Sequence, residues 1–373
     1  TAREAYAPRR GRFKRGVPHA DRRCPHVDGP GRTRSNRAIG RHPKTKLLLV
    51  LDGTGQRLKG RLVGHADLAA CARHLPAWLP LPEAVRADLP RLWTRLLGQP
   101  GFNADLIEDV TRPAGDRILG LGMSLALDGE WQRRLRDDPP ACVAAALYEA
   151  LHQGRYAPPD DKALGAMNAK GEVGFVVLHY AQTRTDLDEA DTLELLSVAM
   201  HLFRGAHAGY RLRELYQEGQ GQEGEYLQSM GFRLRTPARA SSAIRLYGLT
   251  RDEAVRLLPG SPVRDAFQFT PPLIGFAGAE RRLLRLAVTD LTDERIGEEL
   301  GLSIHTIRKL WKDVNARALQ RLPQIFDERE EAVEGARGPE KRRVLLHYLR
   351  QHPEELRPYA LPSGARRGVS PPG

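Results

Sequence analysis

The chain has 373 residues, a formal net charge of +12, 41% hydrophobic residues and 28% charged residues. That length is enough for two domains with buried cores, and the composition is that of a water-soluble globular protein. No apolar run approaches the roughly 20 residues that cross a bilayer, and no apolar core follows the basic N-terminal stretch, which excludes membrane-spanning and signal-peptide patterns. Three scattered cysteines make no disulfide framework, so we expect a cytoplasmic protein.

Most of the positive charge lies in residues 1–46, which carry a balance of +11 and leave +1 for the rest of the chain. This segment is rich in Arg, Gly and Pro, so we expect a disordered basic tail. It either adds salt-dependent affinity for DNA or is an extension without function. His19, Cys24 and His26 lack a fourth ligand at metal spacing, and we expect no metal and no cofactor.

Residues 47–235 are expected to form a mixed α/β domain. The segments Leu47–Asp52 and Arg57–Val63 predict two strands around a glycine turn, and residues 117–127 predict another strand. The intervening and following patterns favour helices, at residues 66–110, 130–136 and 141–153. The opening pair of strands resembles those of PAS and GAF sensory domains, and that resemblance implies a domain that responds to a small-molecule effector.

The second half of this domain begins with the most strand-like segment of the chain, residues 174–182, and continues as a predicted long helix over residues 187–216. Within that helix, Arg204 to Gly209 (RGAHAG) resembles the phosphate-binding loop of the acetyltransferases, and Tyr226 with Gly231-Phe232 resembles their closing segment. This resemblance implies the alternative function, an acetyltransferase-like enzyme, or a degenerate acetyltransferase fold used as a sensor, with a C-terminal helical interaction module.

Residues 236–272 are expected to be a linker, rich in Arg, Ser and Pro, that contains one short helix. Thr250 and Glu253 have the spacing of a capping box, and the Pro-Gly-Ser-Pro sequence that starts at Pro259 stops the helix within three turns. After the linker, residues 273–326 predict three helices, over residues 278–288, after Thr292, and over residues 304–318. Thr292 and Ser303 are typical N-caps, and Gly301 suits the left-handed end of a helix.

The last of these helices has two chemically different faces. At 100° per residue, the apolar face consists of Ile307, Leu310, Trp311 and Val314, and the opposite side holds His305, Lys309, Lys312 and Ala316 with Arg308 on the flank. Leu291-Thr292, Gly301-Leu302-Ser303 and Thr306-Ile307-Arg308 together resemble the helix-turn-helix of LuxR/GerE-type regulators. The resemblance implies DNA contacts by Thr292, Ser303, His305, Thr306, Arg308, Lys309 and Lys312.

Residues 327–361 predict further helices after an acidic stretch, and residues 362–373 predict a disordered tail. The expected fold class is therefore α+β, with a mixed α/β sensory domain followed by an all-α helix-turn-helix domain. We expect a DNA-binding transcriptional regulator rather than an enzyme, with double-stranded DNA as partner, no catalytic residues and no membrane. Because such modules read paired half-sites, we also expect a homodimer.

Overall fold

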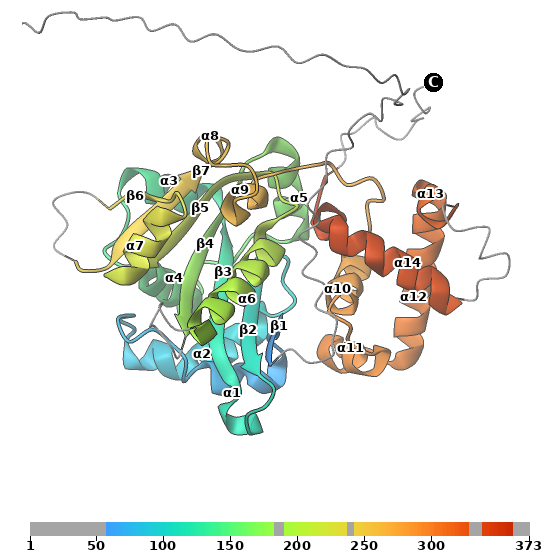
Figure 1. Ribbon diagram of the computed structural model, residues 1–373, viewed down its shortest axis with the longest axis horizontal. Helices are drawn as coiled ribbons and strands as arrows, with labels where there is room; N and C mark the ends of the chain where they lie inside the picture. Colours follow the sequence, from blue (N-terminus) through green and yellow to red (C-terminus); the bar gives the residue numbers. More distant parts are fainter. Residues whose placement is uncertain (1–56, 183–189, 237–241, 328–337, 361–373) are drawn as a thin grey trace, which may run out of the picture. The chain divides into compact units, whose positions relative to one another are not determined.

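The computed structural model describes residues 57–182, 190–236, 242–327 and 338–360 (Figure 1). The basic tail predicted over residues 1–46, the strand predicted at Leu47–Asp52, most of the acidic stretch after Leu322 and the tail at 362–373 lie outside these residues. Within them the fold class is α+β, as predicted. None of the described helices is long and apolar enough to cross a membrane.

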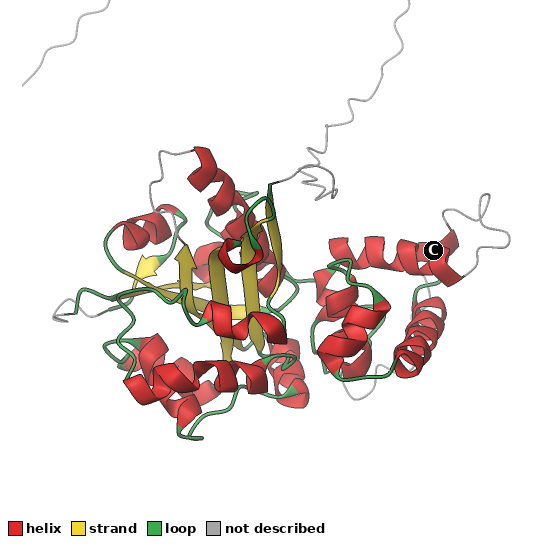
Figure 2. Cartoon of the chain, turned by 90° about the horizontal axis from the view of Figure 1, so that it is seen from below, coloured by secondary structure: helices red, strands yellow, loops and turns green. Residues whose placement is uncertain are grey.

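Residues 57–269, the α/β domain, contain one seven-stranded sheet within the described chain, ordered β1-β2-β3-β4-β5-β7-β6. The strands are β1 (Leu58–Leu62), β2 (Phe102–Asp109), β3 (Ile118–Leu127), β4 (Val173–Gln182), β5 (Leu212–Gly219), β6 (Arg233–Leu234) and β7 (Arg245–Thr250). Six neighbouring pairs hold the sheet together; β4 and β5 are parallel and the others antiparallel. Figure 2 shows the strands framed by helices.

The helices of this domain cover both faces of the sheet. They are α1 (Leu68–Cys71), α2 (Glu83–Leu96), α3 (Gly129–Asp137), α4 (Val143–His152), α5 (Asp161–Lys170), α6 (Ala190–His207), α7 (Gln222–Ser229), α8 (Arg251–Ala254) and α9 (Pro262–Ala266), with 3₁₀ turns η1 (His65–Asp67) and η2 (Ala114–Asp116). Successive strand residues point to opposite faces. On β2, Leu106 joins the core beneath α2 and α4, whereas Ile107 joins the cluster beneath α6.

The two parallel strands separate along their length. β4 pairs with β5 from Val173 to Val177, and β5 ends at Gly219. β4 continues to Gln182 beside β3 without pairing with β5. The sheet is therefore split on the carboxyl side of its parallel pair, which is where open α/β sheets hold their ligands.

The described residues between 273 and 356 form helices and their connecting turns, and Figure 1 labels α10 to α14. The elements are α10 (Gly278–Ala287), α11 (Asp293–Leu300), α12 (Ile304–Arg321), α13 (Gln324–Asp327), α14 (Gly338–Gln351) and the 3₁₀ turn η4 (Pro353–Leu356). We call residues 273–351 the helical module and residues 353–360 the C-terminal segment. The module has its own core, in which Leu283, Leu284, Ile296, Ile307 and Val314 are fully buried.

The predicted ends of α11 and α12 are confirmed. Thr292 accepts a hydrogen bond from the Arg295 amide, and Ser303 accepts one from the Thr306 amide. Gly301 ends α11 with a left-handed φ of 64°. Because each signal acts within a few residues along the chain, the sequence alone was enough to predict it.

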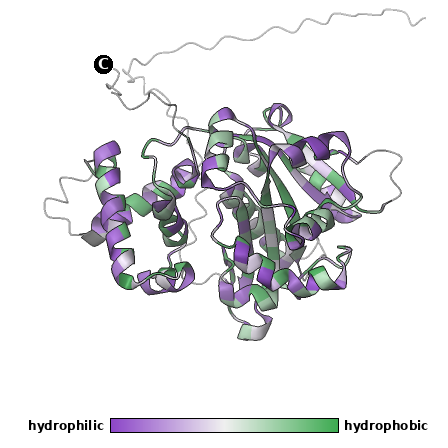
Figure 3. Ribbon diagram, turned by 180° about the vertical axis from the view of Figure 1, so that it is seen from behind, coloured by the Kyte–Doolittle hydropathy of each residue, from purple (hydrophilic) through white to green (hydrophobic). Residues whose placement is uncertain are grey.

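Three predicted elements were wrong. The helix expected over residues 66–110 ends at Leu96 and gives way to β2, and the helix expected over residues 187–216 ends at His207, before β5. The linker predicted at 236–272 contains β7, which pairs with β5, so the predicted domain boundary at 235 falls inside the sheet. These strands are buried on both faces and lack a clear alternation, so their pattern resembled a continued helix or a connector. Figure 3 shows the apolar character of the strands.

The C-terminal segment returns to the α/β domain. Asn168 Nδ2 of α5 donates to the Pro358 carbonyl oxygen at 2.7 Å. Arg357 Nε donates to the Ala208 carbonyl oxygen at 2.9 Å, and Arg357 also donates to the Gly205 carbonyl oxygen. A buried cation thus satisfies carbonyl groups at the end of α6, where the helix dipole favours positive charge.

Candidate functional site

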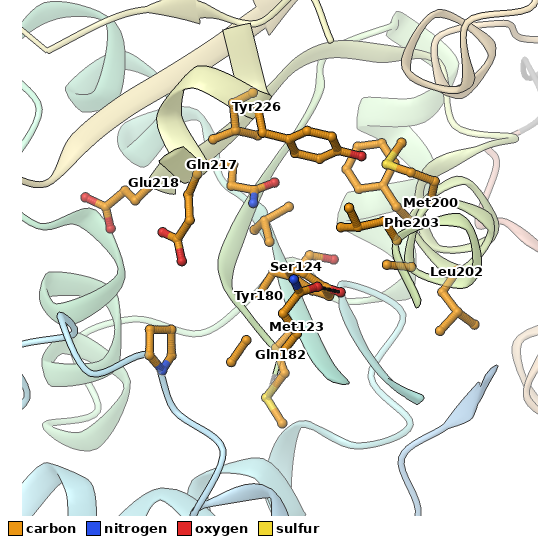
Figure 4. A pocket seen from close by; sticks show the side chains of 18 of the residues that line it. Met123, Ser124, Tyr180, Gln182, Met200, Leu202, Phe203, Gln217, Glu218 and Tyr226 are labelled. Atoms are coloured by element: carbon orange, nitrogen blue, oxygen red, sulfur yellow. Dashed lines mark hydrogen bonds between the residues drawn. The ribbon is translucent and has the colours of Figure 1, made fainter. Parts of the chain in front are cut away.

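A cavity of about 590 Å³ lies where β4 and β5 separate (Figure 4). It is lined by residues of β2, β3, β4, β5, α6 and α7 and by the segment 75–78. Its volume is in the usual range for a site that encloses a small molecule. The surface is predominantly apolar, contributed chiefly by Leu196, Ala199, Met200, Leu202 and Phe203 of α6.

The cavity reaches both faces of the sheet. Met123 and Ser124 are successive residues of β3 and point to opposite faces, yet both line it. Met123 belongs to the core beneath α2 and α4, and Ser124 contacts His207 of α6. Because β4 and β5 have separated, side chains from both faces of the sheet line the same cavity.

The charged groups of the cavity wall are acidic. Asp105, Glu218 and Glu223 line it, together with His207, and no Lys or Arg is among the described lining residues. Such a wall disfavours phosphate and carboxylate groups within the cavity, because an anion there would meet no cation. It suits an apolar chain that carries a hydrogen-bond donor or a positive charge.

Glu223 and Tyr226 are one turn apart on α7 and both line the cavity. Glu223 Oε2 accepts hydrogen bonds from Trp78 Nε1 at 3.0 Å and from the Gln220 amide at 3.2 Å. Burial raises the pKa of Glu223 and also that of Tyr226. In Figure 4 the Tyr226 ring points into the cavity. The pair offers a carboxylate that can take a proton and a phenol that can give one.

Glu218 also lines the cavity, but its carboxylate is already hydrogen-bonded to backbone amides. Its carboxylate accepts hydrogen bonds from the backbone amides of Val143 at 2.6 Å and Ala144 at 2.9 Å, at the start of α4. Burial raises its pKa, and these amides oppose that effect. Glu218 therefore caps α4 from the end of β5 and fixes the wall of the cavity at that point.

On the α6 face, His207, Ser124 and Asn103 form a line of hydrogen bonds. His207 Nδ1 lies 2.7 Å from the Phe203 carbonyl oxygen, and its Nε2 lies 3.1 Å from Ser124 Oγ. Asn103 Nδ2 donates to Ser124 Oγ at 3.3 Å. Burial lowers the pKa of His207 to about 4, so the ring is neutral at pH 7.

Asp105 lies two residues beyond Asn103 on β2 and faces the cavity. Its carboxylate makes no hydrogen bond to any residue that the structure describes. Burial raises the pKa of Asp105 to about 7, and the charges of Arg285 and Arg357 oppose that rise. A cavity-facing carboxyl group whose pKa is raised toward neutrality by desolvation is typical of functional sites.

Structure comparison finds similar folds among acyl-transferring proteins. A spermidine N-acetyltransferase chimera from Vibrio cholerae matches at 9% identity and a TM-score of 0.31, over 54% of this chain and 100% of that one. An N-acyl amino acid synthase from uncultured soil microbes matches at 10% identity and 0.30, over 54% and 96%. An aminoglycoside acetyltransferase in complex with coenzyme A matches at 13% identity and 0.27, over 53% and 98%.

These likenesses are too distant to support an argument about function. No family model matches the chain, and no curated protein matches it in sequence. The acetyltransferase-like alternative from the sequence agrees with them in kind. Its segment Arg204–Gly209, however, closes α6 instead of opening a helix, so its amides do not form the anion site found at helix N-termini.

Six of the seven predicted DNA-contacting residues lie at the start of α12 and along its first turns. Ser303, His305, Arg308, Lys309 and Lys312 are exposed, and Thr306 is half-buried. Thr306 Oγ1 lies 2.9 Å from Ser303 Oγ. Thr292 stands apart from them, as the cap of α11. The opposite face of α12 is buried in the module core through Ile307, Trp311 and Val314, as predicted.

The acidic residues of α11 have partners of their own. Asp293 Oδ1 accepts from Trp311 Nε1 at 3.0 Å and pairs with Arg342 of α14 at 2.7 Å. Glu299 Oε2 lies 3.2 Å from His65 Nδ1 of η1. Asp293 and Glu299 are thus directed to α14 and η1, and the charge of Asp293 is offset by Arg342.

Tyr226 and His207 line the cavity and belong to the two segments that resembled the acetyltransferases, but the sequence reasoning did not single out Asp105, Ser124 or Glu223. The missed residues lie on β2, on β3 and at the start of α7, and only the folded sheet brings them together. A usable signal was a polar residue inside an apolar strand, which Ser124 and Asp105 both provide. No group of three or more potential metal ligands occurs among the described residues.

Proposed function

We propose that the α/β domain is an acyltransferase that passes an apolar acyl group to an acceptor molecule. The observation that carries the proposal is the cavity in the gap between β4 and β5, which is lined by residues from both faces of the sheet. An acyl donor on one face and an acceptor on the other can meet there. Holding two reactants in one enclosed site turns their encounter into a reaction within a complex.

The chemistry rests on two groups of α7. As the acceptor attacks the acyl carbon, its nucleophilic atom must lose a proton, and Glu223 is the nearby carboxylate that can take it. The leaving group of the donor needs a proton in return, and the Tyr226 hydroxyl can supply it. The apolar wall from α6 would hold the acyl chain out of water.

The test is thiol release by the full chain from acyl-coenzyme A donors of increasing chain length, with a panel of primary amines as acceptors. We expect turnover that rises with chain length and falls by roughly 100-fold or more in Tyr226→Phe, the typical contribution of a general acid. Gln228→Ala, an exposed change on the same helix, is the matched control. Absence of thiol release with every donor would overturn the proposal.

A second candidate function is DNA binding by the helical module. It is favoured by the positively charged residues that α12 carries on its exposed face. Arg308, Lys309 and Lys312 are exposed on the side opposite the buried Ile307 and Val314. We propose that this face enters the major groove and that two copies bind paired half-sites.

The measurement is retention of genomic DNA fragments at two salt concentrations. Lys309→Ala combined with Lys312→Ala should abolish specific retention, whereas Arg321→Ala, an exposed change at the far end of α12, should reduce it only slightly. Equal retention by the double variant would remove the DNA candidate. The acyltransferase proposal would be unaffected.

A further inference from the structure

One side chain of the helical module contacts a strand that forms part of the cavity wall. Arg285 of α10 donates from Nη2 to Asn103 Oδ1 at 3.1 Å. Asn103 is 4% exposed and belongs to β2, where it lies two residues before the cavity-lining Asp105. The contact therefore links α10 of the helical module to β2, the strand that carries Asp105.

The line of hydrogen bonds that starts at Arg285 has only one possible direction. A guanidinium can only donate, so Asn103 must turn its carbonyl oxygen to Arg285 and its amide nitrogen to Ser124. At the other end, the Phe203 carbonyl can only accept, so His207 carries its proton on Nδ1 and accepts from the Ser124 hydroxyl at Nε2. Without Arg285 the Asn103 amide could rotate and present its oxygen to Ser124.

Arg285 also acts on Asp105 through charge. The ionisable groups that interact electrostatically with this carboxyl are Arg285 from α10 and Arg357 from the C-terminal segment; His207 from α6 and Tyr180 from β4 line the same cavity. Arg357 is held by the carbonyl groups at the end of α6. The Arg285 charge favours the ionised form of Asp105, which burial disfavours.

We propose that Arg285 is a positioning residue of the acyl-transfer cavity, which the helical module supplies to the α/β domain. It orients Asn103, Ser124 and His207, and it keeps Asp105 available as a carboxylate for the polar end of a ligand. The ligand that such a wall selects is an apolar chain ending in an ammonium group, because the cavity offers a carboxylate and no lining cation. This inference rests on the proposed function for the identity of the site, and it assigns the residue that positions the site and the class of ligand that the site selects.

The test measures binding of dodecylamine to the full chain by calorimetry between pH 5.5 and 8.5. In the wild-type protein the affinity should rise with pH through a midpoint near 7, as Asp105 ionises. In Arg285→Gln the midpoint should move up by about one pH unit, because a nearby positive charge is lost. Arg285→Lys keeps the charge and should restore the midpoint.

Two variants separate this role from a general effect on folding. Arg282→Gln removes the same charge from an exposed position of α10 and should leave the midpoint unchanged. Asp105→Asn should remove the pH dependence in both the wild-type and the Arg285→Gln backgrounds. Near-ultraviolet circular dichroism checks that each variant is folded.

A midpoint in Arg285→Gln equal to that of Arg282→Gln would overturn the inference, and so would a wild-type protein that does not bind dodecylamine. The proposed function fails separately. If dodecylamine binds with the expected pH dependence but no acyl-coenzyme A is consumed, the positioning role stands and the acyltransferase does not. If Arg285→Gln transfers acyl groups with the same pH–rate profile as the wild type, the acyltransferase stands and the positioning role does not.

Discussion

Gly301 holds the turn between α11 and α12 in a conformation that other residues adopt only under strain. Its φ is 64°, and a Cβ at this position would meet no atom within 4 Å, so the cost of a side chain is purely conformational. We expect Gly301→Ala to destabilise the protein by roughly 1 kcal/mol. Gly205→Ala, at a helical glycine with equally open space, should be neutral or stabilising by up to about 1 kcal/mol. Urea unfolding of both variants checks the pair.

His179 gives the fold a sensitivity to acid. Burial lowers its pKa to about 3, whereas an unfolded chain binds the proton near pH 6.5. The neutral His179 therefore costs the folded state no stability above pH 6.5. The free energy of unfolding falls as the pH drops from 6.5 toward 3, because in that range only the unfolded state gains the proton. Asp105, Glu218 and Glu355 have raised pKa values, so their contributions to stability change with pH in the opposite direction. These contributions are the same in the wild type and in a His179 variant, so they cancel when the two proteins are compared.

The expected result concerns the difference between two proteins. Between pH 7.5 and 5.5, the wild type should lose about 1 kcal/mol more of its free energy of unfolding than His179→Phe does. The variant keeps an aromatic ring beside Trp93 and Tyr148. His347→Gln, at an exposed histidine, should leave the pH dependence unaltered. An unchanged slope in His179→Phe would contradict this account.

Residues whose role is local could be predicted from the sequence, and residues whose role depends on the sheet could not. Thr292, Gly301 and Ser303 act on backbone amides and torsion angles within four positions along the chain. Their residue types are therefore nearly sufficient to predict their roles. Asp105 and Ser124 acquire their role only when β2 and β3 lie side by side beneath α6. Nothing within a few residues of Asp105 indicates that Arg285, 180 positions later, will face it.

At the scale of elements, Glu355 joins η4 to the start of the helical module. Its carboxylate accepts from the backbone amides of Leu273 at 2.8 Å and Ile274 at 3.0 Å, and it is 1% exposed. Glu355→Ala leaves two buried amides without a partner, and we expect a loss of about 2–4 kcal/mol. Glu355→Gln keeps one acceptor and should lose less. Thermal unfolding tests the order, with Glu225→Ala as an exposed control.

The helices α3, α4 and α12 and the strands β1, β3 and β4 lie within a few residues of their predicted bounds. Each of α3 and α12 has one apolar face, and β4 is marked by a run of β-branched and aromatic residues. The strands β2, β5 and β7 are mostly buried on both sides, which removes the alternation that would have marked them. The strand order, and with it the gap that holds the cavity, depends on pairings between distant segments and was beyond the reach of the sequence.

At the scale of the whole described chain, the α/β domain depends on residues that follow the helical module. Ending the chain after His352 would remove Arg357 and the Pro358 carbonyl, leaving the end of α6 and Asn168 without these partners. We expect this truncation to lower the unfolding temperature of the α/β domain and to abolish dodecylamine binding. Ending the chain after Ala360 keeps every contact described and should change neither. Equal behaviour of the two truncations would refute the dependence.

The return of the C-terminal segment also limits how the helical module can move. The chain leaves the α/β domain after α9, forms the module, and is fastened again through Arg357 and Asn168. A body attached at two separate points cannot swing about a single hinge. Displacement of α12 relative to the sheet must therefore be a small sliding of packed helices, or it must first release the second attachment. The first route would leave Arg285 near Asn103, whereas the second would open the end of α6 and the cavity beside it.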